Sequence, residues 1–132
     1  MVLDSSALLA ILFSEPRRAS FVAAIDADPV RLMSASTLLE CSIVVLARRG
    51  PDGLRDLDQL LSRAAIQVEA VEQEQAYIAR VAWERFGKGR HAAALNFGDC
   101  FSYALAYVTG EPLLFAGNDL LQTDVQAHPA SG

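Results

Sequence analysis

The sequence lacks an apolar run long enough to span a bilayer and lacks a basic segment ahead of its first apolar run. That run, Ala7–Phe13, is far shorter than the roughly 20 residues that a membrane helix needs. An acid, Asp4, precedes it where a secretion signal would carry basic residues. We therefore expect a soluble cytoplasmic protein that makes no use of a membrane.

Cysteine and histidine are scarce. The two cysteines, Cys41 and Cys100, lie within apolar helical patterns, which indicates reduced core residues rather than a disulfide. His91 and His128 are isolated, so nothing supports a zinc site. Repeats and low-complexity segments are absent, and a hydrophobic content of 52% excludes a disordered or fibrous chain. We expect one domain over residues 1–132, with the final HPASG as a loose tail.

Basic residues are few and unevenly placed. The net charge of −5 argues against a nucleic-acid partner. Residues 80–91, however, hold four basic groups and one acid, whereas residues 92–132 hold only acids: the basic groups are Arg80, Arg85, Lys88 and Arg90, and the later acids are Asp99, Glu111, Asp119 and Asp124. The basic segment is either a solvated surface turn or a loop that attracts phosphates.

Short continuous apolar runs alternate with helical patterns along the chain. Strands are predicted near 1–3, 30–34, 66–71 and 112–115, and helices near 7–13, 18–26, 36–49, 54–65, 72–86 and 97–109. Ser36 is the expected N-cap of the third helix, and Gly50-Pro51 its end. Strands that are apolar throughout are typical of a parallel sheet covered on both faces. The predicted fold is therefore a three-layer α/β/α domain with a central parallel sheet.

Four acids fall where such a sheet binds ligands, at the carboxyl ends of its strands. Asp4 follows the first strand and Asp119 the last, while Glu40 and Asp99 lie in early turns of helices. Each has a simpler explanation, as a cap, an Asx-turn, a solvated helix edge or a charge at a helix N-terminus. Together, four carboxylates at one edge would repel one another. A hard cation with oxygen ligands, Mg²⁺ or Mn²⁺, resolves that repulsion.

Several segments resemble one protein family. The stretch VLDSSALLAIL, the isolated Glu40, the segment GKGRHAAALNFGDCFSYALA and the ending PLLFAGNDLLQTDV are similar to PIN-domain ribonucleases, specifically the VapC toxins of bacterial toxin–antitoxin pairs. The similarity runs from residue 2 to about residue 125. It implies a metal-dependent endoribonuclease with an α/β/α fold, which forms homodimers and is silenced by an antitoxin whose tail covers the acidic site.

The resemblance also assigns roles to residues. It implies that Mg²⁺ or Mn²⁺ is held by Asp4, Glu40, Asp99 and Asp119, with a hydroxyl at Ser6 beside the metal and a further carboxylate at Asp124. Many PIN domains have a hydroxyl and then an acid after the last strand, whereas this chain has Gly117-Asn118-Asp119. The division of work among Asn118, Asp119 and Asp124 therefore stays open.

The expected reaction is hydrolysis of RNA by a metal-activated water that leaves 5′-phosphate ends. Arg85, Lys88 and Arg90 are candidates for contacts with the RNA backbone. Transfer, ribosomal and messenger RNA all remain possible substrates, because target choice depends on shape around the site.

Two other functions remain as alternatives. One is a catalytically inactive PIN-like module that binds RNA or protein. The other is a receiver-like signalling domain that binds Mg²⁺. A receiver domain would need paired acids after the first strand and a lysine after the last, whereas here serines follow Asp4 and the sole lysine, Lys88, lies mid-chain.

Overall fold

The computed structural model describes all 132 residues and contains a four-stranded parallel sheet in the order β3-β2-β1-β4. Val2 of β1 lies opposite Leu32 on one side and Leu113 on the other. The first strand therefore lies inside the sheet, and its carboxyl end is flanked by two other strand ends. The strands are β1 (Val2–Leu3), β2 (Leu32–Ser34), β3 (Gln67–Glu69) and β4 (Leu113–Leu114).

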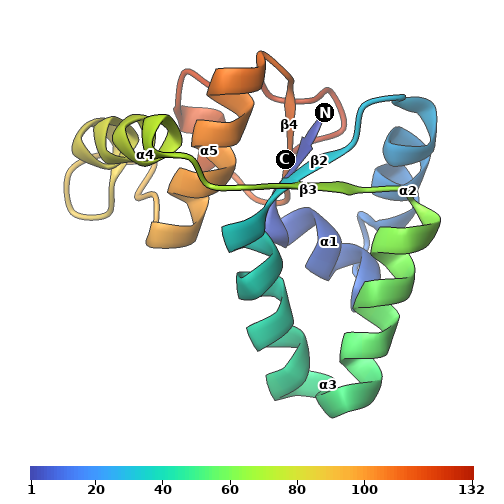
Figure 1. Ribbon diagram of the computed structural model, residues 1–132. Coiled ribbons are helices and arrows are strands. Elements are labelled where there is room, and N and C mark those ends of the chain that lie inside the picture. The colour runs from blue at the N-terminus through green and yellow to red at the C-terminus, as the bar shows by residue number, and fades with distance from the viewer.

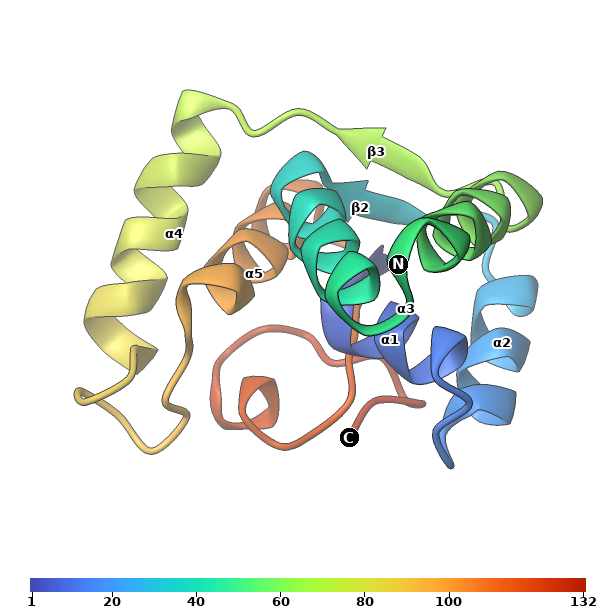
Figure 2. The same cartoon turned by 90° about the horizontal axis from the view of Figure 1, so that it is seen from below.

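Helices cover both faces of the sheet, as Figures 1 and 2 show. They are α1 (Ser5–Leu12), α2 (Arg18–Ala27), α3 (Ala35–Arg63), α4 (Gln73–Phe86) and α5 (Phe97–Thr109), and a short 3₁₀ helix, η1 (Leu120–Gln122), follows β4. Successive strand residues point to opposite faces. Val2 accordingly packs with α4 and α5, and Leu3 with α1, α2 and α3. The predicted three-layer α/β/α fold is confirmed. No helix combines the length and the apolar character that crossing a membrane requires.

Both cysteines are buried free thiols, Cys41 in the core on the α1–α3 side and Cys100 in the core on the α4–α5 side. The two thiols belong to different core clusters and form no disulfide.

The third helix differs from its prediction at its start and agrees with it at the break near Gly50. Ser34, rather than Ser36, is the N-cap: its hydroxyl accepts the backbone N–H of Ser36, because the helix begins directly where β2 ends. Gly50 has φ +63° and ψ −156°, a conformation nearly restricted to glycine. There α3 turns back on itself as a V whose two arms are visible in Figure 1, so the predicted pair of helices forms the two arms.

The final residues are not a loose tail, and that prediction is wrong. His128 donates its backbone N–H to the Leu113 carbonyl at 2.9 Å, and Gly132 donates to Phe115 at 3.1 Å. The Ser131 hydroxyl also donates to Leu113 at 2.9 Å. Because β4 is an edge strand, its outer backbone groups need partners, and the last residues of the chain supply them.

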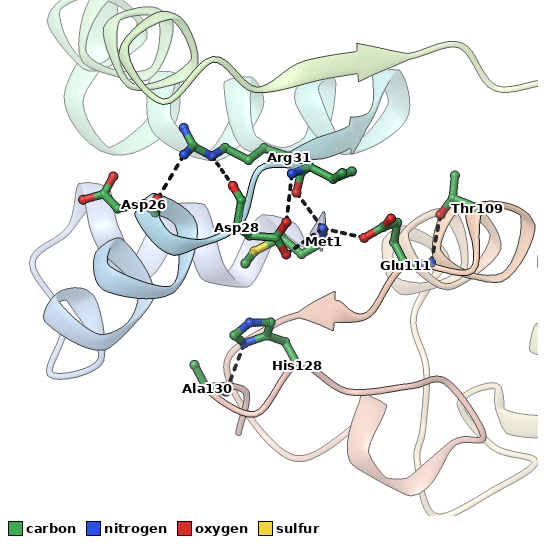
Figure 3. A network of polar contacts seen from close by, with 9 residues as sticks. Met1, Asp26, Asp28, Arg31, Thr109, Glu111, His128 and Ala130 are labelled. Atoms are coloured by element: carbon green, nitrogen blue, oxygen red, sulfur yellow. Dashed lines mark hydrogen bonds and ion pairs between the residues drawn. The ribbon is translucent and has the colours of Figure 1, made fainter.

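An ion-pair network holds the amino end of β1, at the opposite edge of the sheet from Asp4 (Figure 3). The Met1 ammonium donates to Asp28 at 3.1 Å, to Glu111 at 2.8 Å and to the Val30 carbonyl at 2.6 Å. Glu111, one of the four acids in residues 92–132, is therefore paired with the Met1 ammonium, outside the predicted site.

Candidate active site

Asp4 is the most buried acid of the chain, with only 2% of its surface exposed. It ends β1 and caps α1, so its Oδ2 accepts the backbone N–H of Ser6 at 3.0 Å and the Ser6 hydroxyl at 2.5 Å. Its Oδ1 accepts the hydroxyl of Ser102, a fully buried residue of α5, at 2.6 Å. Burial of a carboxylate is tolerated when it is fully hydrogen-bonded. Here neutral donors provide all of those bonds.

Glu40 reaches from α3 across to the first turn of α5. Its Oε1 accepts the Ser5 hydroxyl, and its Oε2 lies directly against the backbone of Gly98. A Cβ at position 98 would come within 1.6 Å of that oxygen. Because Gly98 has no side chain, the Glu40 carboxylate has room to lie against the backbone next to Asp99.

Asp99 forms a capping box at the start of α5. The Asn96 side chain accepts the Asp99 N–H at 2.9 Å, and the Asp99 carboxylate accepts the Asn96 N–H at 2.9 Å. Burial raises the pKa of Asp99 to about 6 against the lowering effect of the Asn96 bond, and the negative charges of Asp4, Glu40 and Asp119 raise it further. Asp99 is thus both the helix cap and a member of a group of acids close enough to act on one another.

The donors at this edge match the chemistry of Mg²⁺ or Mn²⁺. Every side-chain donor is a carboxylate or hydroxyl oxygen, as hard cations prefer. None of Asp4, Glu40, Asp99 and Asp119 forms a salt bridge with a basic group. Burial and the charges of Asp4 and Glu40 raise the pKa of the adjacent Cys41, which keeps it a neutral thiol rather than a soft thiolate ligand.

The carboxylates of the structure do not converge on a single point, since no three His, Cys, Asp or Glu side chains are grouped closely enough to hold an ion. The hydrogen bonds explain this arrangement: Glu40 turns toward Ser5, and Asp99 folds back to Asn96. To bind an ion at this edge, Glu40 and Asp99 must therefore give up these hydrogen bonds and turn their carboxylates toward the metal.

Asp124 and Arg85 have partners that their predicted roles do not anticipate. Arg85 Nη1 donates to Asp124 Oδ2 at 2.9 Å, and the Tyr103 hydroxyl donates to Oδ1 at 2.7 Å. The Tyr103 bond, followed by the contact with Arg85, holds the pKa of Asp124 below its usual value. Both oxygens of Asp124 are therefore engaged with Arg85 and Tyr103, and the charge of Arg85 is paired with Asp124. Lys88 and Arg90 are exposed and have no acidic partner.

Four polar residues of the site escaped the sequence interpretation. Ser5 and Ser102 bond the acids directly, Asn96 caps Asp99, and Thr37 lies 3.3 Å from the Ser102 hydroxyl. The spacing of Ser102, one helical turn after Asp99, is a signal for a shared helix face. Ser6 also has an unexpected second bond, because its hydroxyl accepts the N–H of Ala116 and ties the chain after β4 to Asp4.

Comparisons with known proteins agree with this fold. The family model described as the PIN domain matches residues 1–126. Ribonuclease VapC30 of Mycobacterium tuberculosis is 52% identical over 125 residues, which cover 95% of each chain.

Two solved structures share the fold at low sequence identity. One is Mycobacterium tuberculosis VapC20, described as a sarcin–ricin loop cleaving toxin, with a TM-score of 0.74, 19% identity and coverage of 94% of this chain and 95% of that one. The other is a toxin–antitoxin complex from Klebsiella pneumoniae, with a TM-score of 0.66, 16% identity and coverage of 99% and 94%. From the family model and the identity over nearly the whole chain, we conclude that this protein belongs to the PIN-domain family and, within it, to the VapC ribonucleases.

Proposed function

We propose that this chain is the toxin of a toxin–antitoxin pair, an endoribonuclease in which Asp4, Glu40, Asp99 and Asp119 hold Mg²⁺ or Mn²⁺. The observation that carries the proposal is that Asp4, Glu40 and Asp99 reach the same edge of the sheet, near the starts of α1, α3 and α5, and are hydrogen-bonded only by neutral donors. No cationic side chain pairs with these acids or with Asp119. Membership in the VapC ribonucleases supports the reaction class.

The acids of the site differ in how firmly the fold holds them. Asp4 is fixed on both oxygens by Ser6 and Ser102, so it is the rigid member. Glu40 and Asp99 are partly exposed and bonded mainly through one oxygen each, so they are the members that can turn toward an ion. A divalent cation bound there would supply a water nucleophile near neutral pH and offset the charge that develops on the phosphate.

Neither histidine forms a hydrogen bond or ion pair with any of the four acids. His91 Nδ1 accepts the N–H of Ala93, and His128 Nδ1 accepts the N–H of Ala130, which engages both rings in local turns. We therefore propose water as the nucleophile and expect 5′-phosphate and 3′-hydroxyl ends. End-labelling or mass spectrometry of the products decides this point, and 2′,3′-cyclic phosphates would refute it.

The test of the site is cleavage of total RNA with Mg²⁺ or Mn²⁺ by the wild type, Asp99→Asn and a control, Asp58→Asn. Asp58 is an exposed acid of α3 outside the site. We expect Asp99→Asn to lose roughly 100-fold or more, since even outer partners of metal ligands are worth 10- to 100-fold, and Asp58→Asn to match the wild type. Equal rates for all three proteins would remove the site assignment. RNA that is bound but never cut by the wild type would instead favour the inactive binding module.

We further propose a cognate antitoxin protein as partner and a homodimer as the form of the free toxin. The structural likeness to a toxin–antitoxin complex supports the first of these proposals. Co-expression with the product of the adjacent open reading frame, followed by affinity capture and cleavage assay, tests it. A captured partner should abolish cleavage, and full activity in the complex would contradict the proposal.

A further inference from the structure

An apolar hollow of about 280 Å³ lies between α4 and α5. Three aromatic residues line it, Trp83 from α4 with Phe97 and Phe101 from α5, together with two alanines and Cys100. The one charged residue in the lining is Arg80, and no acid contributes. The hollow lies just below the range of roughly 300–1,000 Å³ typical of small-molecule pockets, which suits one planar group rather than a large ligand.

The aromatic rings of this hollow are unusually accessible. Phe97 is 75% exposed and Trp83 is 37% exposed. Phe97 and Phe101 meet edge to face with ring centroids 4.9 Å apart, an arrangement that fixes both rings while the hollow stays open. Arg80 lies with its guanidinium 4.8 Å from the Tyr77 ring centroid, at the rim of the same surface. The chain therefore keeps open π-faces beside a positive charge.

The first turn of α5 contributes to both the hollow and the proposed active site, since Phe97 and Cys100 line the hollow and Asp99 lies between them in the sequence. Phe97 precedes Asp99 by two residues, which places the two side chains on nearly opposite sides of one helical turn. An α-helix with its side chains is about 10 Å across. Nucleotides in a stacked strand advance roughly 3.4 Å each, so this separation corresponds to about three of them.

We propose that the hollow binds an unpaired nucleobase of the RNA substrate, a few nucleotides from the bond that is cut. The base stacks on Phe97 and Trp83, and Arg80 contacts a neighbouring phosphate. This inference rests on the proposed ribonuclease function. The charge of the lining favours an anionic ligand such as RNA. Its one charged residue, Arg80, is basic, although the protein as a whole carries a net charge of −5. Aromatic stacking accepts any base and requires it to be unpaired, so the hollow selects single-stranded segments.

Trp83 is the only tryptophan of the chain, so its fluorescence reports on the hollow directly. In the experiment, a short single-stranded RNA is titrated into the Asp99→Asn protein in the presence of Mg²⁺. This variant is used so that cleavage does not interfere with the binding measurement. We expect the fluorescence to be quenched by the RNA and not by an abasic backbone of the same length. Phe97→Ala should weaken RNA binding roughly 5- to 150-fold, and Phe97→Leu should weaken it too, because leucine keeps apolar contact but has no π-face.

Tyr107→Ala is the matched control, since Tyr107 is a 64% exposed aromatic at the far end of the same helix. It should bind RNA like the parent protein. The base subsite would be overturned if RNA bound without quenching Trp83 fluorescence. It would also be overturned if the Phe97 variants bound RNA as tightly as the parent protein. A further outcome would also overturn it: the fluorescence changes with protein concentration alone, and sedimentation shows a dimer that Phe97→Ala dissociates. That result would make the hollow an interface between two copies. Cleavage by the wild type is measured separately, so loss of the subsite and loss of the ribonuclease proposal give different results.

Discussion

Ionisation of Asp99 costs the folded protein free energy, and this cost can be measured. Its pKa rises from 3.8 to about 6 on folding, first because of burial and then because of the charges of Asp4, Glu40 and Asp119. A folded pKa above the unfolded one means that the folded state binds more protons between these values. The stability contribution is thus present below about pH 4 and is lost as the pH rises through 6.

The size of the effect follows from these two pKa values. A rise of about two in pKa corresponds to roughly 3 kcal/mol, and discounting for partial exposure leaves about 1–2 kcal/mol. The Asp99→Asn substitution mimics the uncharged acid, and the oxygen of the new amide could still accept the N–H of Asn96. We therefore expect this variant to be more stable than the wild type at pH 7.5 in EDTA by about 1–2 kcal/mol, or roughly 3–8 °C in melting temperature. At pH 4.5 the difference should shrink to about a third of this, because the unfolded carboxyl is already mostly ionised there while the folded one is not.

Urea unfolding at both pH values measures the difference, and Asp58→Asn serves as the control for charge removal at an exposed site. Adding Mn²⁺ should then stabilise the wild type by about 2–3 kcal/mol at 100 times its dissociation constant and stabilise Asp99→Asn far less. A variant that is less stable than the wild type at pH 7.5, or a wild type whose stability ignores pH between 4 and 7, would refute the reasoning that the acids act on Asp99.

Three further substitutions probe the contacts of the site. Gly98→Ala should displace Glu40 and lower cleavage roughly 10- to 100-fold with little change in urea unfolding, because its Cβ would meet only the end of a flexible side chain; wild-type cleavage would contradict the placement of Glu40. Ser102→Ala removes the donor to Oδ1 of Asp4 and should destabilise the fold by about 1–3 kcal/mol, whereas an unchanged unfolding midpoint would mean that this bond contributes nothing. Asp124→Asn should keep cleavage within about threefold and cost under about 1 kcal/mol, as expected for an exposed ion pair; a large loss of cleavage would return Asp124 to the metal ligands.

The sequence predicted the layers of the fold because three of its four strands are largely apolar and its helices carry clear breaks, although the edge strand β3 is mostly polar and exposed. Gly50-Pro51 marked a real change of direction within α3. The N-cap of α3 was misplaced by two residues, since the sequence shows several serines and only the end of β2 decides which one caps the helix. The prediction of a loose tail was wrong because nothing in the local sequence HPASG indicates that it would hydrogen-bond to the edge strand β4.

The four acids at one edge could be predicted because parallel strands bring their carboxyl ends together. Their partners could not. Ser102 is 98 residues from Asp4 in the sequence, and the pair exists only because α5 packs over β1. The pairing of Arg85 with Asp124 likewise depends on how α4 lies against the segment after η1. Local patterns predict which residues are polar, whereas long-range packing decides which of them meet.

Neutral donors, rather than cations, orient the acids of the site. Ser6 and Ser102 hold Asp4, and Ser5 holds Glu40. A lysine or arginine in these places would satisfy the same oxygens and cancel their charge, whereas a hydroxyl fixes the geometry and leaves the charge available. Such an edge repels RNA phosphates until a divalent ion neutralises it. RNA affinity at the acids should therefore depend on the metal, while base stacking between α4 and α5 needs none, which makes the two contacts separable by titration with and without the ion.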